Sequence, residues 1–191
     1  YEVRLVPDAN ERFQMMAAGT IDLTIASLDE LALAFPRFQP GYIIFPAAEN
    51  RGGDGVVENE KSESDLLGFL PVGTCEALAR AVPGRHYQLV SAEGSPRLME
   101  WLKSGQIKGA SLPQPFLAQA QKNGAKLLLD TNQRPTTEVW VASRRLLKNE
   151  LQGRAQASDL KVFAKAWFLF VEQLNSEPDL TLKAMAEQND L

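Results

Sequence analysis

Two stretches of the chain follow one pattern: residues 19–34, GTIDLTIASLDELALA, and residues 105–130, GQIKGASLPQPFLAQAQKNGAKLLLD. Each has an isoleucine two residues after its first glycine, then a short strand-like run, then a segment rich in alanine and leucine that is typical of a helix. A second helical pattern precedes each glycine. This alternation of strands and helices predicts an α/β protein built from βαβ units, with parallel strands and covering helices.

The similarity extends to longer segments. A shift of 86 positions, which takes Tyr1 to Tyr87, aligns residues 1–34 with residues 87–120 without a gap. Gly19 then meets Gly105, and the apolar positions of the helices coincide. Because the pattern occurs twice, it predicts a duplication with two related halves, not a solenoid. The alternative is a chance likeness between two ordinary βαβ units.

Local signals place the elements of each copy. Strand-prone runs at 1–6 and 87–90 lead into turn and capping residues, after which a helix should begin. That helix ends at Gly19 or Gly105, each suited to the left-handed position after a helix. Further strands are expected at 41–45, 55–57, 125–130 and 136–142. The aromatic stripe of a helix spanning Leu160 to Leu174 is interpreted as core packing.

Composition limits the kind of partner. The 191 residues are 45% hydrophobic and 23% charged, which is typical of a globular chain with a real core. The net charge of −4 and the absence of any lysine or arginine block argue against nucleic acid and anionic membranes. No apolar run reaches the roughly 20 residues of a membrane-spanning helix, and the N-terminal residues lack a signal-peptide pattern. We expect a soluble chain, or a mature or trimmed part of a longer one.

The chain has a single cysteine, Cys75, and a single histidine, His86. This excludes a disulfide framework and disfavours a His/Cys metal site. Cys75 follows helical apolar spacing with Leu78 and Ala79, so it is interpreted as a packed residue, not a nucleophile. No phosphate loop, Ser/His/Asp set or metal-ligand spacing is present. We therefore expect no catalytic residues, no metal and no cofactor.

The order of several segments resembles the substrate-binding proteins of bacterial ABC importers. These segments are residues 3–34, GGDGVV at 52–57, SDLLGFLPVGT at 64–74, residues 102–130 and TTEVWVASRRLL at 136–147. The chain is most similar to the nitrate/sulfonate/taurine and thiamine-precursor group, from Tyr1 to about Gln188. The resemblance implies a two-lobed type II periplasmic-binding fold, with a mainly parallel sheet flanked by helices in each lobe. Residues 1–50 and 136–191 would form lobe I, and residues 51–135 would form lobe II.

The chain departs from that group in three places. Its members usually begin with another strand and helix, whereas this chain starts at what would be their second strand. Only the residues FLPV at 69–72 separate Gly68 from the next helix start, where the family has a fuller strand. Gln114 stands between two prolines, where relatives often carry glutamate. All three departures bear on the identity of the ligand.

In open α/β sheets, ligands bind beyond the carboxyl ends of the strands, where helix N-termini present unpaired N–H groups. Five segments are of this kind: 7–10, 27–29, 73–75, 93–95 and 113–116. If the two lobes face each other, these segments converge on one cleft. The candidate ligand-binding residues are Asn10, Ser27, Leu28, Arg51, Asp54, Gly73, Thr74, Gln114 and Phe116.

Each candidate has a second interpretation. Ser27 and Thr74 could donate a hydroxyl to an anion, or could only cap their helices. Gly73 would permit a close backbone approach to a ligand. Gln114 could present its amide to the cleft or to solvent, and Phe116 could wall the cleft or pack in the core.

Arg51 and Asp54 lie in the glycine-rich crossing between the lobes. Arg51 could pair with an oxyanion and Asp54 with a ligand amine, or both could belong to a solvated turn. The resemblance implies a non-catalytic receptor that closes over a small anionic or heterocyclic ligand, such as a sulfonate, a nitrate-like anion or a pyrimidine-type compound. It would present that ligand to an ABC permease, in the periplasm or outside the cell, and could be membrane-anchored in the full-length precursor.

Two alternatives remain open. The first is an enzyme on the same scaffold, like relatives in the menaquinone and pyrimidine pathways, with Asp54 or Glu138 as a working carboxylate. The second is a ligand-sensing domain of a signalling protein.

Overall fold

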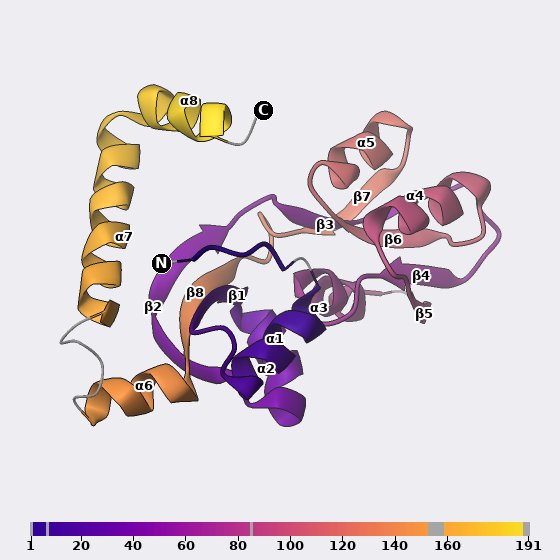
Figure 1. The fold of residues 1–191 in the computed structure, drawn as a ribbon. Coiled ribbons are helices and arrows are strands. Elements are labelled where there is room, and N and C mark those ends of the chain that lie inside the picture. The colour runs from indigo at the N-terminus through magenta and orange to yellow at the C-terminus, as the bar shows by residue number, and fades with distance from the viewer. Residues whose placement is uncertain (1, 7, 85, 153–158, 189–191) are drawn as a thin grey trace. The chain divides into compact units, whose positions relative to one another are not determined.

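The computed structural model describes residues 2–6, 8–84, 86–152 and 159–188 (Figure 1). It divides into two compact units, Tyr1–Arg144 and Arg145–Leu191, and each is described by itself. The first unit contains all eight strands of the described residues, in two sheets with helices beside them. The α/β class expected from the sequence is confirmed.

The smaller sheet has three strands in the order β1-β8-β2: Leu23–Ser27, Thr136–Ser143 and Gly41–Asn50. The central strand β8 is antiparallel to both neighbours. Helices α1 (Ala9–Ala18) and α2 (Leu28–Phe38) supply Phe13, Met16 and Leu31 to a core that also contains Val139 and Val141 of β8. These apolar positions recur with helical spacing and alternate along the strand, which explains the layered packing.

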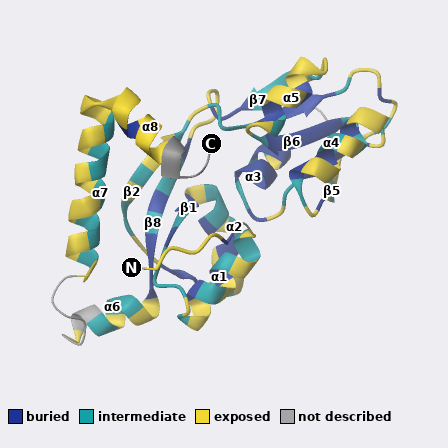
Figure 2. Ribbon diagram, turned by 45° about the horizontal axis from the view of Figure 1, so that its top comes forward, coloured by how far each residue is buried: buried dark blue, intermediate teal, exposed yellow. Residues whose placement is uncertain are grey.

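The larger sheet has five strands in the order β5-β4-β6-β3-β7. Their bounds are Gln88–Ser91, Leu66–Phe69, Gly109–Pro113, Asp54–Glu58 and Lys126–Asp130. Strand β4 is parallel to β5 and β6, whereas β3 is antiparallel to β6 and β7. Helices α3 (Thr74–Ala81), α4 (Ser95–Ser104) and α5 (Phe116–Lys122) pack against this sheet. Figure 2 shows β6 as a dark, buried strand among them.

The mainly parallel sheets expected from the sequence are confirmed, and each sheet contains one inserted strand that runs antiparallel to the others. The strands before and after α2, β1 and β2, are parallel to each other, as a βαβ unit requires, but β8 lies between them. Likewise β3 lies between β6 and β7, the strands before and after α5. Each inserted strand comes from a distant part of the chain and runs in the opposite direction.

The two sequence copies form equivalent elements. Helices α1 and α4, and strands β1 and β6, have bounds that differ by the 86 positions of the repeat. Gly19 and Gly105 end their helices with φ of 73° and 76°, the left-handed conformation expected there. The first strand of copy one is not formed: residues 2–6 are outside any strand, and Val3 and Leu5 are 95% and 88% exposed. The strand expected at 1–6 is therefore wrong within the described residues.

The second unit is helical within the described residues. Helix α6 (Arg144–Leu151) follows β8, and α7 (Asp159–Ser176) and α8 (Pro178–Gln188) pack on each other. Trp167 and Phe170 of α7 contact each other in a tilted arrangement, with their ring centroids 5.7 Å apart. However, α7 has no fully buried residue, so its aromatic stripe is not the core element that the sequence predicted. Among the described residues, no helix is both long and apolar enough to cross a membrane.

Candidate ligand-binding site

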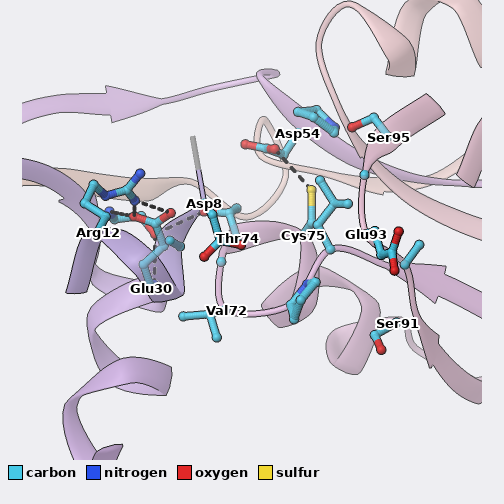
Figure 3. Close-up of a pocket in the computed structure, with 18 of the residues that line it drawn as sticks. Asp8, Arg12, Glu30, Asp54, Val72, Thr74, Cys75, Ser91, Glu93 and Ser95 are labelled. Carbon is cyan, nitrogen blue, oxygen red and sulfur yellow. Dashed lines mark hydrogen bonds and ion pairs between the residues drawn. The ribbon is translucent and has the colours of Figure 1, made fainter. Parts of the chain in front are cut away.

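A cavity of about 1030 Å³ lies within the first unit and is lined by elements of both sheets (Figure 3). All five helix-start segments predicted from the sequence contribute to its lining: Asp8 and Ala9, Ser27, Gly73 to Cys75, Glu93 to Ser95, and Pro113. Its volume is at the upper end of the range for small-molecule sites. The convergence expected from the arrangement of the strands is present.

Ser27 joins the two sides of this cavity. Its hydroxyl accepts a hydrogen bond from the Glu30 N–H at 3.0 Å, and the Glu30 carboxylate accepts one from the Ser27 N–H at 3.1 Å. This capping box fixes the start of α2. The Thr74 hydroxyl, at the start of α3, donates to Ser27 Oγ at 3.2 Å in a buried contact. Both hydroxyls therefore already have structural partners.

The Glu30 carboxylate also forms an ion pair with Arg12 of α1. One guanidinium nitrogen of Arg12 lies 3.0 Å from each Glu30 oxygen, and the other donates to the Val6 carbonyl at 3.4 Å. Both side chains are about one-fifth exposed. Burial raises the pKa of Glu30, and the Arg12 charge opposes that rise. The positive charge of Arg12 is thus engaged by a neighbour on the cavity wall.

Asp54 is held at the start of β3 by a small polar network. Its carboxylate accepts hydrogen bonds from Asn50 at 2.6 Å and from the Cys75 thiol at 3.4 Å. Its backbone N–H donates to Thr131 Oγ1 at 3.3 Å, and Thr131 donates to Asn50 Oδ1 at 2.9 Å. Burial raises the pKa of Asp54; burial and the neighbouring Asp54 charge raise the pKa of Cys75 well above its usual value. The thiol is therefore a poor nucleophile, in line with the packed role expected for it.

Glu138 of β8 lies opposite Ser27 in the sheet register and also lines the cavity. It is half-buried, and within the described residues its carboxylate has no hydrogen bond or ion pair. Burial, followed by repulsion from Glu30 and Asp54, raises its pKa to about 6. Because burial and repulsion destabilise the ionised form of this carboxylate, a positively charged or hydrogen-donating neighbour would stabilise it.

The loop before α3 brings the larger sheet against the smaller one. Val72 has φ of 53°, which is strained for a β-branched residue. Its N–H donates to the Glu76 carboxylate at 2.8 Å, while its side chain packs with Phe13 and Met16 in the core of the smaller sheet. Strain of this kind is typical of functional sites, where the surrounding contacts maintain it.

Of the nine candidates, Ser27, Asp54, Gly73 and Thr74 line the cavity. The other five are placed outside its lining. Asn10 lies in the first turn of α1, and Leu28, which begins α2, is 44% exposed.

The last three have other partners. Arg51 pairs with the exposed Glu49 at 2.9 Å. Gln114 donates to the Gly52 carbonyl at 3.3 Å and accepts from the Ala118 N–H, so it ties the crossing to α5. Phe116 packs against the core of the larger sheet, which is the second of the two roles predicted for it.

Several lining residues were missed. Arg12 and Glu30 were not candidates, although Ser27 followed by Glu30 is the S-x-x-E signature of a capping box. Glu138 was named only as a carboxylate for an enzyme. Nothing local in the sequence distinguishes it from any polar residue of a half-buried strand.

Neither protein-family models nor the sequences of curated proteins give a match to this chain. Solved structures do. The periplasmic aliphatic sulphonate binding protein SsuA of Escherichia coli is similar with a TM-score of 0.63 at 16% identity, over 97% of this chain and 67% of that chain. The alkanesulfonate-binding protein SsuA of Xanthomonas axonopodis pv. citri, bound to MOPS, gives 0.61 at 15%, over 97% and 68%. A solute receptor for L-cysteine of Neisseria gonorrhoeae gives 0.56 at 15%, over 96% and 70%.

At such low identity, this likeness shows the fold. The chain has the type II α/β fold of periplasmic solute receptors, and the resemblance seen in the order of its sequence segments is confirmed at that level.

Proposed function

We propose that this chain is a non-catalytic receptor that binds a small solute in the cavity between its two sheets and presents it to an ABC permease. The observation that carries the proposal is the convergence of five helix starts, from both sheets, on one cavity of about 1030 Å³. The receptors and binding proteins with the same fold support it. Their periplasmic members support a periplasmic location.

The proposed mechanism is closure of two lobes over the solute. Residues 1–50 and 136–191 would form lobe I and residues 51–135 lobe II. For residues up to Ser143, the separation of the strands into two sheets supports this division. The hinge would lie in the two crossings, near Gly52 and Gly53 and near Arg134 and Pro135. Thr131, close to the second crossing, forms hydrogen bonds with Asn50 and Asp54 on either side of the first, and so links the two crossings. Contacts that the solute makes only in the closed state would shift the population toward it.

A receptor fits the chemistry of the cavity better than an enzyme. Burial and the neighbouring Asp54 carboxylate raise the pKa of the Cys75 thiol and so suppress its ionisation. Glu138, with its pKa raised to about 6, is a lining group that would suit a general base. Recovery of an unchanged solute after long incubation with the protein supports the receptor, whereas turnover that Glu138→Gln abolishes would support the enzyme.

The lining also bears on the ligand classes expected from the sequence. Sulfonate and nitrate-like anions would meet five carboxylates and one guanidinium that is already paired. A heterocyclic solute with hydrogen-bond donors is compatible with the same groups. We therefore place a pyrimidine-type compound ahead of the two anions.

The test is to identify and titrate the solute. Small molecules released by denaturing the purified protein are identified by mass spectrometry, and calorimetry is performed with sulfonates, nitrate, pyrimidines and flavins. Ser91→Trp, which places a large side chain on the lining, should abolish binding; Ser104→Trp, at the exposed end of α4, is the matched control. A protein that releases no solute and binds neither these compounds nor the organic cations tested below would contradict the proposal.

A further inference from the structure

We propose that the solute is an organic cation, carrying an ammonium, amidinium or guanidinium group, and that Asp54 and Glu138 bind this group from opposite sides of the cavity. This inference rests on the proposed receptor function and specifies the chemical class of its ligand.

The two carboxylates occupy equivalent places in the duplicated scaffold. Ser27 ends β1 and Pro113 ends β6, and these residues correspond through the 86-position repeat. In the register of the sheets, Ser27 pairs with Glu138 and Pro113 pairs with Asp54. Each inserted strand therefore carries an acidic side chain at the cavity end of its sheet, one on either side of the bound solute.

The charge of the lining is strongly one-sided. Its ionisable acids are Asp8, Glu30, Asp54, Glu93 and Glu138. Arg12 is the one arginine or lysine among the lining residues, and two of its guanidinium nitrogens already contact Glu30 and Val6. The Arg12–Glu30 pair cancels within the wall, which leaves four carboxylates without a cationic partner on the lining. The net charge of the lining side chains therefore repels an anion and attracts a cation, and it opposes the partial positive charge of the helix starts at the cavity.

Asp54 and Glu138, the two carboxylates proposed to bind the solute, can each accept further hydrogen bonds. An ionised carboxylate has about four lone-pair sites. Asp54 uses one oxygen for Asn50 and the other for a weak donor, the Cys75 thiol at 3.4 Å. The Glu138 carboxylate is unpartnered within the described residues and faces the same cavity. A bound ammonium or guanidinium group would complete both sets of hydrogen bonds with charge assistance.

An organic cation fits better than a metal ion. Within the described ranges, no three His, Cys, Asp or Glu side chains are grouped closely enough to hold a metal. The volume of about 1030 Å³ is also far larger than an ion needs. Ala92, Pro113 and Ile25 supply apolar surface for the remainder of an organic solute.

Calorimetry at pH 7.5 and low salt would compare putrescine, agmatine and benzamidine with ethanesulfonate, glutarate and benzenesulfonate. We expect at least one of the cations to bind and none of the anions. Asp54→Asn and Glu138→Gln should each weaken cation binding by about 10- to 100-fold, the effect of losing one charge-assisted hydrogen bond. Glu100→Gln, an exposed acid of α4 outside the lining, should leave the affinity unchanged within about twofold. Both carboxylate variants are isosteric, and far-UV circular dichroism would verify that they fold.

Three outcomes would overturn the inference: binding of the anions in place of the cations, binding of none of the cations, or cation binding that neither variant weakens. If an anion binds, or denaturation releases an anionic solute, the receptor function stands and only the ligand class is wrong. If no compound binds and no solute is released, both proposals fail.

Discussion

The two copies of the duplicated unit share a backbone plan but differ in chemistry. Helix α1 and strand β1 of the first copy correspond residue for residue to α4 and β6 of the second. Yet Arg12 of the first copy corresponds to Leu98, which is fully buried in the core of the larger sheet. Glu30 corresponds to Phe116, which packs on the same core. The same two positions thus hold an ion pair in one copy and apolar packing in the other.

This difference shows how a symmetric scaffold forms an asymmetric site. In the second copy these positions complete a hydrophobic core. In the first they place a guanidinium and a carboxylate on the cavity wall, where the capping box of α2 fixes the carboxylate. The comparison predicts that the polar pair is important to the stability of copy one, while the helix-end glycines are equally important in both.

The largest expected effect is that of Arg12→Met. Removing the guanidinium leaves the mostly buried Glu30 without its cation, so we expect a loss of about 2–3 kcal/mol in the free energy of unfolding, somewhat below the value for a fully buried pair. Urea unfolding followed by far-UV circular dichroism would measure it. Adding Glu30→Gln, which can preserve the capping box, should recover part of the loss.

The matched control is Arg97→Met on α4. Arg97 also pairs with an acid, Glu100, but the two side chains are 54% and 64% exposed. An exposed pair of this kind contributes little, so the loss should stay below about 0.5 kcal/mol. Equal effects of the two substitutions would contradict the asymmetry between the copies.

The second prediction concerns Gly19→Ala and Gly105→Ala. Both glycines end a helix with positive φ, where a Cβ is strained, and each substitution should cost about 1 kcal/mol. The same urea titration would measure both. Since the two positions are equivalent, their costs should agree within about 0.5 kcal/mol. A large difference would mean that the copies do not share this helix end.

These glycines also show what the sequence could establish. The start of α1 at Asp8 and its end at Gly19 depend on local capping chemistry, so they could be predicted from residues close together in the chain. The position of β8 between β1 and β2 could not be. It depends on pairs such as Ser27 with Glu138, which are more than a hundred residues apart.

The residues of the site also fall into two groups, those that can be predicted from local sequence and those that depend on distant contacts. Ser27, Gly73 and Thr74 were identified because they stand at helix starts, and such positions are visible locally. Arg12 lies inside a helix, where a polar side chain predicts only a solvent-exposed face. Its role depends on the distant Glu30, and that contact exists only in the folded chain.

The third prediction is that Glu138→Gln stabilises the unliganded protein. Because the folded-state pKa of Glu138 is about 6, above the ordinary 4.5, its stabilising protonation is complete below pH 4.5 and is lost as pH rises through about 6. At pH 7.5 the variant should gain up to about 1 kcal/mol, allowing for partial solvent screening of the half-buried group, or about 2–4 °C in Tm.

Thermal unfolding between pH 4.5 and 7.5 would measure this gain. The variant should have a flatter fall in stability across the interval from pH 4.5 to 6 than the wild type. Asp54→Asn is the comparison from the other sheet. Asp54 accepts hydrogen bonds from Asn50 and Cys75, so its replacement should bring no such gain. A loss of stability in Glu138→Gln at pH 7.5 would indicate that this carboxylate has a partner in the unliganded protein.

The smallest expected effects compare Val3→Ser with Leu89→Ser, substitutions at equivalent positions of the two copies. Val3 is 95% exposed and lies outside any strand, so its replacement should change the free energy of unfolding by less than about 0.5 kcal/mol. Leu89 is 37% exposed and pairs with Leu67 in β5, so serine there should cost about 0.5–1 kcal/mol through lost strand propensity and packing. Urea titrations in parallel would resolve the difference. A cost for Val3→Ser equal to that of Leu89→Ser would mean that residues 2–6 gain a strand partner in solution and that the two copies are more alike than their present conformations.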